Sequence, residues 1–279
     1  MCYAASSLML IGALCCRTSL SAQSAAYINP TGTTVETRFK LPDGYERIPA
    51  AKNSYVYFLR HLPMLPYGTN CCNDPSEAHY AGRLNIPAIN NMLQDLHLCI
   101  RLRGEYFFRQ EQYDKIAFTI INFKRLFYTP WVEGLDIVIN DKRYRTKQPK
   151  NVDRLPSFRN YLTFVFSNTN AKTLLADVQP VPANNIMPGD MFIHADHPSY
   201  TVIVLDVAYN PKTGDRIFLL ATTNKSTKTS CILVNPKEAW SGSPWYSIKA
   251  GETKLTTPEF VFNKQDLRRF QEMSMASKN

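Results

Sequence analysis

The stretch Tyr200–Val207, which reads YTVIVLDV, is the part of the sequence that decides the fold. Its centre, Val202–Leu205, is continuously apolar and consists almost entirely of β-branched residues. A short apolar run of this composition is typical of a strand with no solvent-exposed side. We therefore expect Val202–Leu205 to be buried on both faces of a sheet.

Other runs with β-forming composition surround this stretch. Asn210–Asp215 (NPKTGD) has the residues of a tight turn and predicts a hairpin between the runs on either side of it. Together they predict a mainly antiparallel sheet in the last third of the chain. The predicted strands of this sheet are Met191–Ile193, Tyr200–Val207, Arg216–Ala221 and Ser230–Val234, and two strands are predicted earlier in the chain, over Lys115–Asn122 and Leu135–Ile139.

Helical patterns precede most of these strands. The longest predicted helix covers Ile89–Arg109, where apolar residues recur at helical spacing. A second is predicted after Pro156, with Ser157 as its N-cap. Shorter helices are expected after Ser54, as far as Leu62, and over Gln265–Met275. The pattern predicts a single α+β domain over 24–279 in which a long helix packs on the sheet, with 24–50 as a loosely attached lead-in.

The composition is that of an ordinary globular protein. The chain has 279 residues, of which 44% are hydrophobic and 20% charged, so a disordered chain is excluded. Seven cysteines are too few for a disulfide-based miniprotein. The formal net charge of +9 indicates non-specific contacts with anions, and it says nothing of fold or reaction.

The N-terminal segment has the features of a secretory signal. Residues 1–16 carry no charge, Leu8–Cys16 is apolar, and small residues follow Arg17. This run is too short to span a bilayer permanently, so we expect a signal peptide over 1–23. The alternatives are an ordinary apolar N-terminus and a lipoprotein signal, for which Leu14 before Cys15 fits poorly.

Four cysteines remain after the predicted cleavage: Cys71, Cys72, Cys99 and Cys231. A disulfide between the neighbours Cys71 and Cys72 is geometrically strained, which leaves two ways of pairing all four. Free cysteine is often a buried apolar residue, and we favour that interpretation for Cys99 and Cys231. No CxxC pair is present, so a structural zinc site is not expected.

A family resemblance rests on an ordered set of short motifs, none of which is specific alone. In this order and spacing they resemble the secreted bacterial proteins of domain-of-unknown-function family 4846, over nearly the whole chain after the signal. The motifs are Leu41–Tyr45, Leu59–Pro63, Arg101–Tyr106 (RLRGEY), Gly189–Ile193, Val202–Val207, Asn235–Pro236, Pro244–Tyr246 and Thr257–Phe260.

The resemblance implies a layout but no settled activity. Typical members carry a Cys at the start of the long helix, a His leading into the buried strand, and a Gln-rich motif after the next strand. A thiol at a helix N-terminus with a His on an adjacent strand suits nucleophilic catalysis. The layout resembles papain-like (NlpC/P60-type) thiol hydrolases, and this link is a fold analogy. It also implies a cell-envelope location in a Gram-negative bacterium, secreted or periplasmic.

This sequence departs from the family at each of those three points. Ungapped counting places the family Cys at Asp95 and the family His at Tyr200, while Thr222–Lys228 replaces the Gln-rich motif. A carboxylate is a far weaker nucleophile towards an amide than a thiolate. We therefore predict a catalytically degenerate member, retained as a binding or structural module, with a remnant cleft at Asp95, Tyr200 and Thr222. No cofactor is expected.

Several alternatives remain open. One is a hydrolase with changed chemistry, acting on cell-envelope material, in which Asp95 and His197 serve as acid and base. Another is a shifted dyad of Cys99 and His197. His194 and His197 could suggest a metal, but no third ligand is identifiable, so no metal site is predicted. Asp206 and Glu105 are expected to be buried acceptors without a catalytic role.

The basic residues concentrate in one segment, 141–154, which holds six Lys and Arg. It lacks the interleaved aromatic residues that stack on single-stranded nucleic acid, so no nucleic-acid partner is expected. We interpret the segment as a solvated loop. An anionic partner in the cell envelope, either glycan or peptide, is the alternative, and no stable membrane span or oligomeric state is implied.

Overall fold

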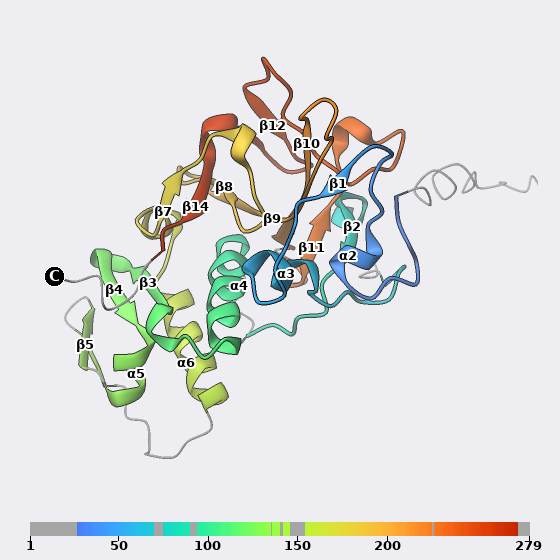
Figure 1. Cartoon of the computed structure of the whole chain (residues 1–279). Coiled ribbons are helices and arrows are strands. Elements are labelled where there is room, and N and C mark those ends of the chain that lie inside the picture. Colours follow the sequence, from blue (N-terminus) through green and yellow to red (C-terminus); the bar gives the residue numbers. More distant parts are fainter. Residues whose placement is uncertain are drawn as a thin grey trace, which may run out of the picture.

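One antiparallel sheet dominates the computed structural model (Figure 1), which describes residues 27–69, 75–89, 94–134, 136–139, 142–145, 154–224 and 226–272. Seven of its eight strands follow the order β2-β11-β10-β9-β8-β14-β7, and β1 pairs with β9 off this path. The strands are β1 (Glu46–Arg47), β2 (Tyr80–Arg83), β7 (Val178–Pro180), β8 (Met191–His194), β9 (Tyr200–Tyr209), β10 (Arg216–Thr223), β11 (Ser230–Leu233) and β14 (Leu267–Phe270).

Strand β9 is the longest strand and lies in the middle of this order. It pairs antiparallel with β8 on one side and β10 on the other, with a register shift between Leu219 and Leu220. The Asn210–Asp215 turn joins β9 to β10, as predicted. All four residues of Val202–Leu205 are buried, which confirms the expectation for this run.

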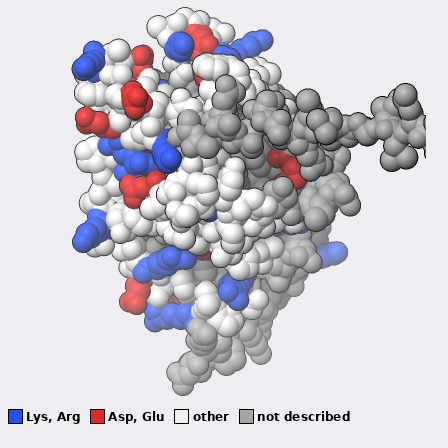
Figure 2. All heavy atoms as spheres, turned by 90° about the vertical axis from the view of Figure 1, so that its right-hand side faces the viewer, with Lys and Arg blue, Asp and Glu red and all other residues white. Residues whose placement is uncertain are grey.

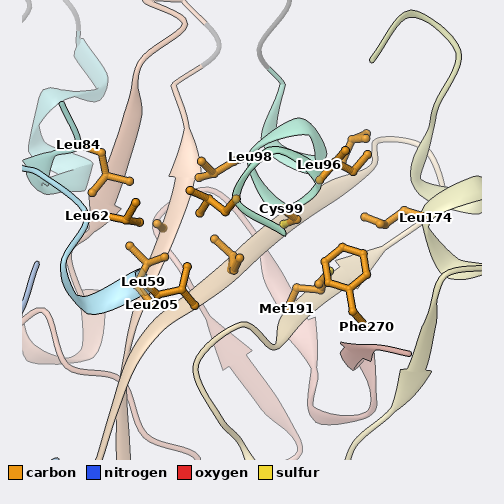
Figure 3. Close-up of a cluster of buried hydrophobic side chains, with 14 of the residues drawn as sticks. Leu59, Leu62, Leu84, Leu96, Leu98, Cys99, Leu174, Met191, Leu205 and Phe270 are labelled. Carbon is orange, nitrogen blue, oxygen red and sulfur yellow. The ribbon is translucent and has the colours of Figure 1, made fainter. Parts of the chain in front are cut away.

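Helices cover one face of the sheet. They are α2 (Val35–Arg38), α3 (Tyr55–Arg60) and α4 (Asp95–Arg109), and α3 and α4 both pack on β9. Between these helices and the sheet lies the helix-side cluster, whose members include Leu59, Leu98, Cys99, Ile203 and Leu205 (Figure 3). Each large aliphatic side chain buried here contributes roughly 1.5–3 kcal/mol to folding.

The opposite face is covered by the C-terminal third of the chain. A hairpin of β12 (Lys254–Thr256) and β13 (Val261–Asn263) lies over it, together with Tyr246. The hairpin-side cluster includes Phe192, Val204, Phe218 and Phe262. Neighbouring residues of β9 thus belong to different clusters, because successive side chains of a strand point to opposite faces.

A helix-rich part lies to one side of the sheet, at the lower left of Figure 1. Gly104 of α4 marks its contact with α6, because a Cβ atom there would lie 3.3 Å from the Phe158 ring. The elements are β3 (Ala117–Ile120), β4 (Lys124–Phe127), α5 (Tyr128–Gly134), β5 (Asp136–Ile139), β6 (Lys142–Arg145), α6 (Arg154–Ser167) and α7 (Ala171–Leu175). Short 3₁₀ turns are η2 (Pro75–His79), η3 (Tyr113–Lys115), η4 (Ile121–Phe123), η5 (Ala183–Asn185), η6 (Pro236–Glu238) and η7 (Lys264–Asp266).

The expected fold class is thereby confirmed at the level of a mixed single domain with helices and a mainly antiparallel sheet. Every strand pair within the described ranges is antiparallel. In the same ranges, no helix has both the length and the apolar character needed to cross a membrane. The predicted signal peptide and the Cys71–Cys72 pair lie outside the described residues.

Two predicted helix boundaries were wrong. The long helix begins at Asp95, because Gln94 has extended backbone angles (φ −116°, ψ 171°) and forms the N-cap. The second helix includes Arg154 and Pro156, so Ser157 lies inside it and not at its cap. Proline is well tolerated in the first turn of a helix, so the position of Pro156 does not show which residue begins the helix.

The C-terminal helix predicted over Gln265–Met275 was also wrong. The chain instead makes the short turn η7 and then strand β14, which pairs with β7 and β8. Arg269 in this strand forms a bidentate ion pair with Asp190, at 2.6 and 2.8 Å. Completing the sheet outweighs the local helical preference of these residues.

The N-terminal lead-in is not loosely attached. Phe39 is fully buried, and β1 pairs with β9. Arg47 of β1 and Arg60 of α3 both bind Asp206, at 2.6 and 2.5 Å. Asp206 is therefore the buried acceptor that the sequence indicated, and it fastens this segment to the sheet.

Candidate functional site

Asp95 is the first residue of α4, at the position where the family resemblance predicts a thiol. Its side chain is buried, and Oδ1 accepts a hydrogen bond of 2.9 Å from the backbone N–H of Leu96. A carboxylate is stabilised at a helix N-terminus by the free N–H groups and by the helix dipole. The same field would stabilise a thiolate at this position.

The second oxygen of Asp95 joins the helix to the sheet. Oδ2 accepts a hydrogen bond of 2.9 Å from the backbone N–H of Thr201 in β9. Thr201 is the neighbour of Tyr200, where the family resemblance predicts a His. The backbones of two positions more than 100 residues apart in the sequence are thus brought together at the start of α4.

The Tyr200 side chain lies on the other face of the sheet from α4. Its ring stacks on Phe260 at 4.6 Å and packs against the hairpin-side cluster. Thr222 is buried, and its hydroxyl donates to the carbonyl of Thr201 at 3.3 Å. The three predicted positions therefore meet around the backbone of residues 200–201, while Asp95 and the Tyr200 ring lie on opposite sides of it.

The two other histidines considered for chemistry lie at the β8–β9 connection. His197 is exposed in this turn, and His194 pairs with Tyr200 across the two strands. The His194 ring lies 4.8 Å from that of Phe260. In the described part of the chain, no group of three or more His, Cys, Asp or Glu residues could hold a metal ion.

Cys99 is an ordinary buried residue, as we favoured. It is fully buried in the helix-side cluster, where Figure 3 shows it on α4 among the core leucines. Burial raises the pKa of its thiol, and the nearby charge of Asp95 raises it further. Cys99 lies inside the helix-side cluster whereas His197 is exposed in the β8–β9 turn, which argues against the shifted dyad of these two residues. Cys231 is buried as well, with Sγ 3.4 Å from Arg83 Nη1.

His97 is a buried residue beside this site that the sequence analysis missed. Its Nδ1 accepts a hydrogen bond of 3.1 Å from the backbone N–H of Gln94, and its ring stacks on Phe166 at 4.4 Å. These contacts make it part of the helix cap. The sequence signal for this role is its place two residues after Asp95, in the first turn of α4. That signal was hidden because the helix was predicted to begin at Ile89.

A polar group on the Tyr200 side of the sheet was missed too. Glu259 accepts a hydrogen bond of 3.1 Å from the Tyr80 hydroxyl and lies 3.8 Å from His79 Nδ1. It directly precedes Phe260, the residue that stacks on Tyr200. No sequence pattern links residues 79–80 to residue 259, because the connection exists only through the packing of β2 and the Thr257–Phe260 turn.

The basic segment is described only in part. Lys142–Arg145 forms β6 and pairs with β5, whereas 146–153 lies outside the described residues. The predicted loop was therefore wrong for Lys142–Arg145, which form a strand, although Lys142 is exposed. The face that Figure 2 shows is turned away from β5, and on it Lys and Arg are interspersed with Asp and Glu.

Comparison with known proteins gives one match. A family model described as domain of unknown function (4846) covers residues 35–269. No curated protein matches the chain, and no solved structure does.

Proposed function

Because the chain belongs to the family of domain of unknown function 4846, we propose that it is a catalytically silent relative of a thiol hydrolase, retained as a secreted binding or structural module. The bonding of Asp95 is the observation that carries this proposal. Both of its carboxylate oxygens accept backbone N–H groups, one from α4 and one from β9. The residue at the nucleophile position thus acts as a structural link.

A thiol hydrolase needs a thiolate and a base that face each other. At position 95 the helix field is present but the thiol is absent, and at position 200 an aromatic ring replaces an imidazole. That ring is stacked on Phe260, on the far side of the strand from Asp95. The helix start and the adjacent strand of the predicted site are present in this chain, whereas the thiol and the imidazole that would react are replaced by Asp95 and Tyr200.

The half-buried surface around Tyr200 supports a binding role. The Tyr200 ring stacks on Phe260, the His194 ring is tilted against Phe260, and the neighbouring residue Glu259 contacts Tyr80 and His79. Aromatic rings next to a carboxylate suit a sugar, whose C–H faces pack on rings and whose hydroxyls donate to carboxylates. We therefore propose cell-envelope glycan, or the peptide attached to it, as the ligand of this secreted or periplasmic protein.

The catalytic half of the proposal is tested with the purified full chain on peptidoglycan fragments and peptides. We expect no turnover. Wild-type hydrolysis that Asp95→Ala or His197→Ala abolishes would overturn the proposal.

The binding half is tested by co-sedimentation with insoluble peptidoglycan. Phe260→Ala and Glu259→Gln should each weaken retention several-fold, while Trp240→Ala, an exposed aromatic residue outside this group, should not. Charge reversal of Lys142 separates this site from the basic segment. Retention that depends on Lys142 and salt, but not on Phe260, would assign binding to that segment instead.

A further inference from the structure

Arg103 of α4 lies in a cage of aromatic rings that the proposed function does not use. Its guanidinium carbon is 4.3 Å from the ring centre of Phe107, 5.3 Å from Tyr55 and 5.7 Å from Phe270. The three rings come from α4, α3 and β14, so the cage exists only in the folded chain. We call these four residues the Arg103 cage.

A glycine allows one wall of the cage to form. Gly189 has a φ of +94°, and a Cβ atom there would lie 2.6 Å from the Tyr55 ring. Any larger residue would displace this ring from its place. Both Gly189 and Arg103 belong to the motifs that the sequence analysis singled out and that the Asp95 site leaves without a role.

The guanidinium of Arg103 has no acceptor among the described residues. Each of the other described arginines that are buried or half-buried donates at least one side-chain hydrogen bond, as Arg60 does to Asp206. Burial lowers the pKa of Arg103. Contacts with rings stabilise a cation by about 0.5–2 kcal/mol, and they leave its N–H groups unused.

Two more hydrogen-bond donors lie at the Arg103 cage, the ammonium group of Lys115 and the hydroxyl of Tyr55. Lys115 Nζ lies 5.9 Å from the centre of the same Phe107 ring. The Tyr55 hydroxyl is buried and has no hydrogen-bond partner among the described residues, and the Tyr55 ring lies 5.3 Å from the guanidinium carbon of Arg103. Glu272 also attracts Arg103 electrostatically, but it is exposed and accepts no hydrogen bond from it. The local charge is therefore positive, and the donors exceed the acceptors.

We propose that the Arg103 cage is an anion-binding site, in which the guanidinium holds the carboxylate or phosphate group of a ligand. A guanidinium offers a planar fork of donors that matches either oxyanion. The rings fix the fork in place before binding, which lowers the entropic cost of holding the anion. The site is independent of Asp95 and of the surface around Tyr200.

The test titrates the full chain with inorganic phosphate and with acetate, at constant ionic strength kept by sodium chloride. The readouts are the arginine Nε–Hε resonances and the Tm. We expect one anion to shift the Arg103 resonance in a saturable way and to raise the Tm, which identifies the preferred oxyanion. Arg103→Lys should weaken binding about tenfold or more, because lysine cannot replace the planar fork.

Arg109→Lys is the matched control. Arg109 lies over the Phe58 ring at 5.1 Å but is exposed, so its replacement should leave binding unchanged. If Arg103→Lys fails to fold, Lys115→Gln replaces it, with an expected loss of about threefold. The site would be overturned if Arg103→Lys, or Lys115→Gln in its place, bound the anion as well as the wild type does. The absence of a saturable shift with either anion would overturn it too. So would a Glu272→Gln variant that lowers the Tm as Arg103→Lys does while neither anion binds, since Glu272 would then be the partner.

Discussion

A single carboxylate, that of Asp95, connects two elements that are distant in the sequence. It accepts the N–H of Leu96 in α4 and the N–H of Thr201 in β9, both at 2.9 Å. Thr201 is buried, so its N–H depends on a protein acceptor. At the residue scale, position 95 therefore matters for stability even though it has no nucleophile.

Replacing Asp95 by alanine should lower the free energy of unfolding by about 1–3 kcal/mol, because the buried Thr201 N–H then loses its acceptor. Asp95→Asn keeps one carbonyl oxygen and should cost less. Urea unfolding followed by circular dichroism measures both. An alanine variant as stable as the wild type would show that the Asp95 bonds contribute nothing.

At the scale of elements, the buried Asp206 is what fastens β1 and α3 to the sheet. It receives Arg47 from β1 and Arg60 from α3, and the Val207 N–H adds a third hydrogen bond. Asp206 is fully buried, and the side chain of Arg60 is only 5% exposed. These two arginines thus have an ionic partner that water cannot replace.

Asp206→Asn should lower the free energy of unfolding by about 3–5 kcal/mol, because it leaves two arginines facing a neutral group. Asp43→Asn, at an exposed position before β1, is the matched control and should stay within about 0.5 kcal/mol of the wild type. Chemical denaturation of both variants provides the comparison. A loss at Asp206 no larger than that at Asp43 would contradict the fastening role.

The sequence located the central elements correctly and misplaced their boundaries. Strands β8 to β11 and the end of α4 follow from apolar periodicity, which local composition determines. The start of α4 does not, because Ile89, Met92 and Leu93 continue the helical spacing while Gln94 adopts an extended cap. Strand β14 was missed since Leu267–Phe270 becomes a strand only through its pairing with β7 and β8.

At the scale of the whole molecule, the core holds several tyrosines away from water. Tyr161 and Tyr246 are buried, and burial raises the pKa of both phenols. Their hydroxyls donate to backbone carbonyls, those of Leu126 and Val234. These phenols therefore cannot ionise without loss of packing on both sides of the sheet.

This burial predicts cooperative unfolding at alkaline pH. Tyrosines of the unfolded chain titrate near pH 10, and the folded pKa values are higher, so the folded state binds protons more tightly. The stabilisation is complete below about pH 10 and is lost as pH rises towards the folded values. Exposed tyrosines ionise first, and the last part of the rise in absorbance at 295 nm, which belongs to the buried tyrosines, should therefore coincide with the loss of far-UV circular dichroism. Tyr161→Phe should make the pH dependence shallower, and full tyrosine ionisation with unchanged dichroism would contradict the prediction.

The sequence by itself determined the antiparallel sheet around β9, the long helix packed on it, and the family. These features depend on hydrophobic periodicity and motif order, which are local properties of the chain. Only the tertiary structure decided that Asp95 binds β9, that the Tyr200 ring faces the other way, and that Arg103 lies among three rings. Such contacts join residues far apart in the sequence, and strand register and helix packing fix them once the core has closed.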